Sequence, residues 1–161
     1  MIITPSELKE KIKITQKTPM GVYFHYPFCQ KKCLYCHFYS YQGGEKDHNL
    51  WLQAILKEIN LLASGKADQM EVDTAYFGGG TPSSLLPEEI ELILSRLEEN
   101  FNCNLEEITL EFNPGSHTQK LAEFKQAGIN RLSVGAQSFS GKVLKTLGRL
   151  HSVEDIFAAA R

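Results

Sequence analysis

Short apolar and aromatic runs alternate along this chain with longer segments in which apolar residues recur every three or four positions. The short runs are rich in β-branched and aromatic residues and predict strands at residues 22–26, 72–77, 108–112 and 131–136. The segments with helical spacing predict helices at residues 47–64, from Pro87 through Leu97, and from Ser116 to a stop at Gly128. Strands that alternate with helices indicate an α/β fold with a parallel sheet, here of four β/α units.

The two ends of the chain carry expectations of their own. Residues 1–19 are polar and are predicted to form a lead-in with one short helix after Thr4-Pro5, so the core domain is expected over residues 20–161. Serines in capping positions are predicted to begin three helices, at Ser116, Ser140 and Ser152. The last helix is expected to continue to Arg161, which favours the interpretation that the chain is part of a longer polypeptide.

The composition is that of an ordinary globular protein, with 42% hydrophobic residues, 22% charged residues and a formal net charge of -2. This charge gives no reason to expect a nucleic-acid partner. No apolar run approaches the roughly 18 residues of a membrane span, and the polar N-terminus lacks the apolar core of a secretory signal. We therefore expect a cytoplasmic, reducing setting, in which the four cysteines indicate metal or redox chemistry rather than disulfides.

An unusual feature follows each predicted strand. A cysteine loop follows the first strand, "GGGTP" (78–82) follows the second, Glu111 and Asn113 lie near the end of the third, and Gln137 lies just past the fourth. In parallel α/β folds, ligands bind at the carboxyl ends of the strands. The four features are therefore expected on one rim, and we predict the binding site there.

The cysteine loop is the strongest single signal. Cys29, Cys33 and Cys36 are spaced C-x3-C-x2-C, and three thiolates at this spacing can bind three irons of a [4Fe-4S] cluster. The fourth iron would then be open to a substrate, as in catalytic metal centres. Two alternatives stay open at this point, a zinc site completed by His37 and a redox pair of Cys33 and Cys36. Cys103, alone near the end of a predicted helix, is expected to be a small buried hydrophobe.

The other rim residues each have a functional and a structural interpretation. The Gly78–Gly80 run either exposes backbone groups that suit the amino group of a small ligand or makes a tight turn. Glu111 either faces a ligand or hydrogen-bonds the 113–115 turn, and Gln137 either contacts ribose hydroxyls or caps the next helix. Arg149 offers a fork for a carboxylate, although surface arginines commonly have no specific partner.

Four segments carry a resemblance to a known family. "VYFHYPFCQKKCLYCHF", "YFGGGTPSSL", "ITLEFNPG" and "INRLSVGAQSFSGKVLKTLGRLHS" make residues 20–161 resemble the radical S-adenosylmethionine (SAM) enzymes. Within that family the chain is similar to the branch that contains oxygen-independent coproporphyrinogen III oxidase and the HemW-type heme chaperones. The resemblance implies a parallel partial (β/α) barrel of the radical SAM type, with about four of the family's six β/α units present.

The resemblance also implies cofactors and their contacts. Cys29, Cys33 and Cys36 would ligate the [4Fe-4S] cluster, SAM would chelate the open iron, and one electron would cleave SAM to methionine and a 5'-deoxyadenosyl radical. Tyr23, which shares a face of its strand with His25, would contact the ligand near the cluster. The remaining positions that match cofactor contacts of the family are Tyr35 (along the adenine), Gly79, Gly80 and Thr81 (at the amino-acid end or a second nucleotide group), Glu111, Gln137 and Arg149.

Departures from the family pattern shape the functional expectation. Phe38 stands where the oxidases carry a further cysteine, which favours heme handling over porphyrinogen oxidation. His37 stands where an acid is expected in the chaperone branch, and nothing in the sequence explains this change. Family members are more than twice as long and add further strands and a C-terminal region that is thought to hold heme. A sheet cut after its fourth unit has an uncovered edge, so we expect this chain alone to be poorly stable or to need a partner.

The leading hypothesis is therefore a radical SAM protein of the heme-chaperone type, active in heme or porphyrin metabolism. Its cofactors would be a [4Fe-4S] cluster and SAM, with heme or a porphyrin as a further candidate ligand and a flavodoxin-like protein as the electron donor. Two alternatives are a coproporphyrinogen III oxidase and a non-catalytic metal-binding fragment.

Overall fold

The structure is a computed structural model that describes residues 19–66, 70–115 and 118–161. The predicted helix after Thr4-Pro5 and the predicted cap at Ser116 lie outside the described residues. Across the described ranges, no helix combines the length and the apolar character that crossing a membrane requires.

The chain forms the predicted parallel sheet, with four strands in the order β1-β2-β3-β4. The strands are β1 (Pro19–Tyr26), β2 (Glu71–Gly79), β3 (Asn102–Phe112) and β4 (Arg131–Val134). β3 begins six residues before the predicted start at 108. The prediction missed residues 102–107 because they are mostly polar and give no apolar pattern. These residues nevertheless pair with the beginning of β2, so tertiary pairing sets the start of the strand.

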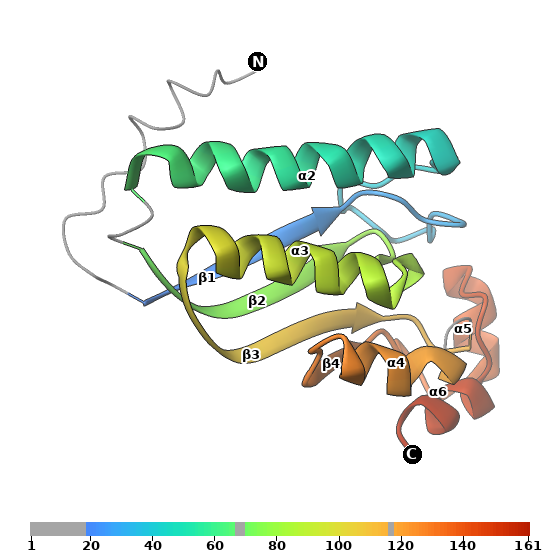
Figure 1. Cartoon of the computed structure of the whole chain (residues 1–161). Coiled ribbons are helices and arrows are strands. Elements are labelled where there is room, and N and C mark those ends of the chain that lie inside the picture. Colours follow the sequence, from blue (N-terminus) through green and yellow to red (C-terminus); the bar gives the residue numbers. More distant parts are fainter. Residues whose placement is uncertain (1–18, 67–69, 116–117) are drawn as a thin grey trace.

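Helices α2 (Glu45–Lys66), α3 (Pro87–Asn100) and α4 (Leu121–Gln126) lie side by side over one face of the sheet (Figure 1). Their apolar stripes bury the core with the strand residues that face them, including Phe24 and Phe77, whose rings stack 4.8 Å apart between centroids. Phe77 is fully buried, and Ile90 and Ile93 of α3 are fully buried as well. The helical spacing in the sequence is thus confirmed as the core-facing pattern.

Two short helices, α5 (Gly141–Leu147) and α6 (Val153–Ala159), lie beyond the carboxyl ends of the strands (Figure 1). Ser152 caps α6 as predicted, since its hydroxyl accepts from the Asp155 backbone N–H at 3.2 Å. Ser140 occupies the cap position of α5 without a side-chain cap hydrogen bond. The prediction that the last helix continues to Arg161 is wrong, because α6 ends at Ala159.

A hydrogen-bond chain ties the end of β1 to two helices. The Tyr26 hydroxyl lies 3.0 Å from His48 Nδ1, and His48 Nε2 lies 2.6 Å from a Glu89 carboxylate oxygen. The other Glu89 oxygen accepts from the Leu86 backbone N–H, which caps α3. Burial raises the pKa of Tyr26 to about 12. These hydrogen bonds fix the end of β1, which leads into the cysteine loop.

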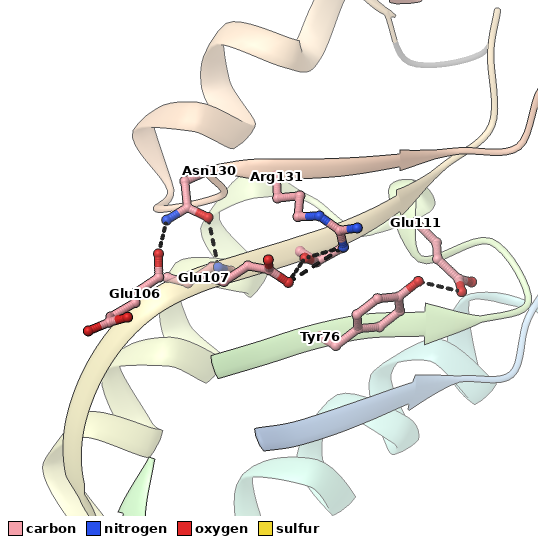
Figure 2. Close-up of polar contacts among 8 residues, drawn as sticks. Tyr76, Glu106, Glu107, Glu111, Asn130 and Arg131 are labelled. Carbon is pink, nitrogen blue, oxygen red and sulfur yellow. Dashed lines mark hydrogen bonds and ion pairs between the residues drawn. The ribbon is translucent and has the colours of Figure 1, made fainter. Parts of the chain in front are cut away.

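The second face of the sheet carries a row of polar and tyrosine side chains. Tyr23, Tyr76, Thr109 and Arg131 are register partners across all four strands, and Tyr23 stacks on Tyr76 at 5.7 Å between centroids. The Arg131 guanidinium donates to Thr109 Oγ1 at 3.2 Å and lies 3.5 Å from a carboxylate oxygen of Glu107 (Figure 2). In a closed barrel this face would be the interior, so the chain presents a polar inner wall rather than a packed apolar one.

Asn130 joins the start of β4 to β3 through its side chain. Its Oδ1 accepts from the Ile108 backbone N–H at 2.8 Å, and its Nδ2 donates to the Glu106 carbonyl at 2.9 Å (Figure 2). Because Ile108 is buried, removing the amide would leave its N–H without this acceptor.

We expect Asn130→Ala to lower the free energy of unfolding by about 1–3 kcal/mol, measured by urea denaturation followed by circular dichroism. The matched control is Asn104→Ala, an exposed asparagine of β3, which should change stability by at most about 0.5 kcal/mol. Equal costs for the two variants would contradict the assigned role of Asn130.

Candidate functional site

A cavity of about 630 Å³ lies at the carboxyl ends of the four strands, where the sequence predicted the site. Its volume is in the range of small-molecule and cofactor sites. Of the predicted site residues, those that line it are Cys29, Cys33, Cys36, Tyr35, Gly79, Gly80, Thr81, Glu111, Gln137 and Arg149. Tyr23 does not line it but lies below the rim on the inner face of β1.

The cysteine loop is closed by backbone hydrogen bonds at both of its ends. The Cys29 N–H donates to the Tyr41 carbonyl and the Tyr41 N–H donates to the Pro27 carbonyl, both at 3.0 Å. Between them the Cys36 N–H donates to the Cys33 carbonyl at 3.1 Å, which forms the turn between these two cysteines. The three thiols are free and partly exposed, so they are available as ligands.

Three free thiols are ligands of the type that iron–sulfur clusters use. Among the described residues, no three His, Cys, Asp or Glu side chains converge closely enough to hold one ion. In a [4Fe-4S] cluster each thiolate binds a different iron, so the sulfurs need not meet at one point. His37, the fourth ligand of the zinc alternative, is exposed and is not part of the cavity lining.

The glycine run packs directly against the cysteine loop. The Gly80 N–H donates to the Tyr26 carbonyl at 2.7 Å, and the Thr81 N–H donates to the Phe28 carbonyl at 2.9 Å. A Cβ on Gly80 would lie 2.5 Å from the Phe28 oxygen and 3.0 Å from Cys29 Sγ. Gly80 is therefore required by close approach between the two loops, beyond any need of a turn.

Glu111 binds the glycine loop and a neighbouring strand, not the 113–115 turn. One carboxylate oxygen accepts from the Tyr76 hydroxyl at 3.0 Å (Figure 2), and the other accepts from the Gly79 N–H at 3.0 Å. The alternative prediction that Glu111 hydrogen-bonds the 113–115 turn is therefore wrong, because its partners are Tyr76 and Gly79. Burial raises the pKa of Tyr76, and the nearby Glu111 carboxylate adds to that rise.

Arg149 is the centre of the polar network in the cavity. Its Nη2 donates to Asn113 Oδ1 at 2.6 Å and to the Gly135 carbonyl at 2.9 Å, and its Nη1 lies 3.4 Å from Cys33 Sγ. Asn113 in turn donates to Thr81 Oγ1 at 3.2 Å. The Arg149 Nε is buried and has no hydrogen-bond partner among the described residues, so one donor of the fork is left for a ligand.

His151 is buried beside Arg149 and is held in its neutral form. Its Nε2 lies 3.2 Å from the Ala136 carbonyl, which can only accept, so Nε2 carries the proton. Its Nδ1 then accepts from Arg149 Nη2 at 3.3 Å. Burial lowers the pKa of His151, and the Arg149 charge adds to that effect.

Two other predicted contacts, Gln137 and Tyr35, also line the cavity. Gln137 lines the cavity, is exposed, and has a positive φ of 63°. The interpretation of Gln137 as a helix cap is wrong, because Ser140 occupies the cap position of α5. Tyr35 lines the cavity with 38% of its surface exposed, so its ring is accessible from the cavity mouth.

The sequence interpretation of Cys103 needs a correction. The residue lies in β3, not near the end of a helix, because the strand begins earlier than its apolar pattern suggested. Its side chain is partly buried against the core, and burial raises the pKa of its thiol to about 11. It is therefore a structural cysteine, as expected, although it is not fully buried.

Sequence reasoning missed the site roles of Asn113 and His151. Asn113 was placed on the predicted rim but given no specific role, and His151 was quoted in a motif without a role. Neither residue belongs to a local pattern, since Asn113 meets Arg149 and His151 meets the Ala136 carbonyl only where separate loops come together. The available signal was position alone, because Asn113 follows β3 directly at the predicted rim.

Comparison with known proteins places the chain among relatives of one superfamily. Residues 23–161 match the family described as "Radical SAM superfamily". The heme chaperone HemW of Escherichia coli is 36% identical over 149 residues, which cover 89% of this chain and 38% of that protein. HemW of Mycobacterium tuberculosis is 40% identical over 147 residues, which cover 88% of this chain and 37% of that protein. The chain thus spans less than two-fifths of the length of these curated relatives.

A solved structure supports the same grouping. The coproporphyrinogen III oxidase of Escherichia coli, described as a radical SAM enzyme, superposes with a TM-score of 0.81 at 28% identity. The match covers 96% of this chain and 36% of that protein. The predicted resemblance and the partial-barrel fold are therefore confirmed for the part of the fold that the chain contains.

The neutral state of His151 gives a pH prediction. Between its lowered folded-state pKa and the ordinary value of 6.5, His151 binds more protons in the unfolded chain than in the folded one. The free energy of unfolding should therefore fall as the pH drops below about 6.5. We expect His151→Gln, which can keep both hydrogen bonds without titrating, to flatten this part of the curve in urea unfolding. The control His37→Gln, at an exposed histidine, should keep the wild-type slope, and a wild-type slope in His151→Gln would contradict the assignment.

Proposed function

The chain belongs to the radical SAM superfamily, and from this membership we propose that residues 20–161 form a core domain that binds a [4Fe-4S] cluster and SAM. Cys29, Cys33 and Cys36 would hold the cluster. The observation that carries the proposal is that these three free thiols line one cavity together with the polar rim residues of all four strands. A reduced cluster of this kind supplies the electron that cleaves bound SAM.

The glycine loop suits the amino group of SAM through its carbonyl oxygens. The N–H groups of Gly79, Gly80 and Thr81 already donate within the protein, to Glu111, Tyr26 and Phe28 respectively. An ammonium group is a donor only, and it needs acceptors such as carbonyls. The loop therefore offers the ligand the type of backbone group that its amino end requires.

Arg149 suits the carboxylate end of SAM. Its Nε donor is buried without a partner among the described residues, and a ligand carboxylate would accept from it. Gln137 and Glu111 would supply groups for ribose hydroxyls, with Glu111 exchanging one of its present bonds for a ligand hydroxyl. Tyr35 is accessible from the mouth, where it would stack along the adenine.

The physiological role that we propose is heme handling. The curated relatives that support it are named heme chaperones, although the chain covers less than two-fifths of their length. Phe38, 59% exposed in the cysteine loop, stands where the oxidases are expected to carry a further cysteine. Heme or a porphyrin would be the transported ligand, and a flavodoxin-like protein the electron donor.

A second candidate, coproporphyrinogen III oxidation, is favoured by the structural match to the Escherichia coli oxidase. The two candidates share the proposed cofactor site. They differ in whether the protein carries heme or oxidises a porphyrinogen. They are therefore separated by product formation and not by cofactor binding.

The cluster proposal predicts a sharp difference between two cysteine variants after anaerobic reconstitution. Cys33→Ala removes one thiolate of the set and should lose most of the bound iron and labile sulfide. Cys103→Ala, in β3 outside the cavity lining, should keep the wild-type content of both. Iron and sulfide analysis measures the outcome. A wild-type protein with one bound zinc and no labile sulfide would instead identify the chain as a non-catalytic metal-binding fragment.

The choice between chaperone and oxidase predicts the fate of a supplied porphyrinogen. Reconstituted protein with SAM and a reductant should cleave SAM but leave coproporphyrinogen III unconverted, as followed by chromatography. Formation of protoporphyrinogen IX would favour the oxidase. Heme added to the same protein should give a shifted Soret band if the described part of the chain contributes to heme binding.

A further inference from the structure

The guanidinium of Arg149 contacts the sulfur of a predicted cluster ligand. Its Nη1 donates toward Cys33 Sγ at 3.4 Å, which is within hydrogen-bond range for sulfur, and the two residues are 116 positions apart in the chain. Both groups are partly buried in the cavity lining. The contact therefore comes from tertiary structure and brings a permanent cation to one of the three thiols.

The rest of the guanidinium is held in a fixed orientation. Nη2 donates to Asn113 Oδ1 at 2.6 Å and to the Gly135 carbonyl at 2.9 Å, and it also meets His151 Nδ1 at 3.3 Å. Asn113 is oriented in turn by its bond to Thr81 Oγ1. Because Nη2 is fixed by these acceptors, the planar fork directs Nη1 at the sulfur.

A cation that donates to a thiolate changes the energy of electron uptake. Reduction of a [4Fe-4S]²⁺ centre adds one electron and no bond is made or broken, so the negative charge on the cluster and its sulfurs increases. A hydrogen bond to a sulfur stabilises that added charge and raises the reduction potential. Partial burial weakens solvent screening, so one guanidinium has a measurable effect at this distance.

We propose that Arg149 raises the reduction potential of the cluster through its hydrogen bond to Cys33, and that Asn113 is the positioning residue that directs the guanidinium. This role is additional to the carboxylate contact and rests on the proposed function, since it requires a cluster on the three cysteines. Arg149 thus links the SAM side of the cavity to the cluster side.

The test is a potentiometric titration of the reconstituted full chain with dithionite as reductant, without SAM, monitored by electron paramagnetic resonance. Arg149→Met should shift the midpoint potential to a more negative value, and Asn113→Ala should shift it in the same direction by less. Arg96→Met is the matched control, because it removes the same charge from α3, outside the cavity lining, and should leave the potential unchanged. An unchanged potential in Arg149→Met, or an equal shift in Arg96→Met, would overturn the proposal.

A second measurement keeps the test valid if Arg149→Met folds poorly. Wild-type protein labelled with ¹⁵N-arginine, reduced and free of SAM, should show a weak ¹⁵N hyperfine coupling to the cluster. The other arginines, at positions 96, 131 and 161, do not line the cavity. Absence of the coupling would refute the hydrogen bond in the loaded protein.

The outcomes separate this proposal from the proposed function. Wild-type protein that assembles no iron and sulfide would overturn both. A cluster whose spectrum responds to SAM, together with an unchanged potential in Arg149→Met, would leave the proposed function in place and overturn the role of Arg149 alone.

Discussion

Parallel pairing of the four strands is the constraint on which the site depends. Because β1 to β4 run in one direction, their carboxyl ends meet at one edge, and the loops that follow them share a single cavity. Backbone hydrogen bonds then lock these loops together, since Gly80 and Thr81 donate to carbonyls at the end of β1 and the beginning of the cysteine loop. The position of Cys29 is thereby set by the sheet itself and not by the flexibility of a surface loop.

The two faces of the sheet have different functions. One face packs Phe24, Phe77 and their neighbours beneath helices α2, α3 and α4, which supplies the apolar burial that stabilises a domain of this size. The other carries Tyr23, Tyr76 and Arg131 in one register row and has little apolar surface to bury. This polar face leads up to Glu111 at the rim, where the cavity begins.

Much of this arrangement could be predicted from the sequence, because it is encoded in local patterns. Apolar periodicity located the strands and the helices α2 and α3, and the cysteine loop was placed correctly at the carboxyl end of β1. Contacts between residues far apart in the sequence leave no such local pattern and could not be predicted. The early start of β3, and with it the place of Cys103, depends on pairing with β2, and the hub of Arg149, Asn113 and His151 depends on loops that meet only in the fold. Glu111 was placed correctly on the rim, but its partners Tyr76 and Gly79 lie on the neighbouring strand.

Gly80 shows how little room the junction between β2 and the cysteine loop contains. Its Cα faces the Phe28 carbonyl and the Cys29 sulfur at distances that exclude even a methyl group. Any other side chain would therefore push the first cysteine away from the other two and alter the spacing among the three sulfurs. The relative positions of the three cysteine sulfurs therefore depend on the lack of a Cβ atom at residue 80.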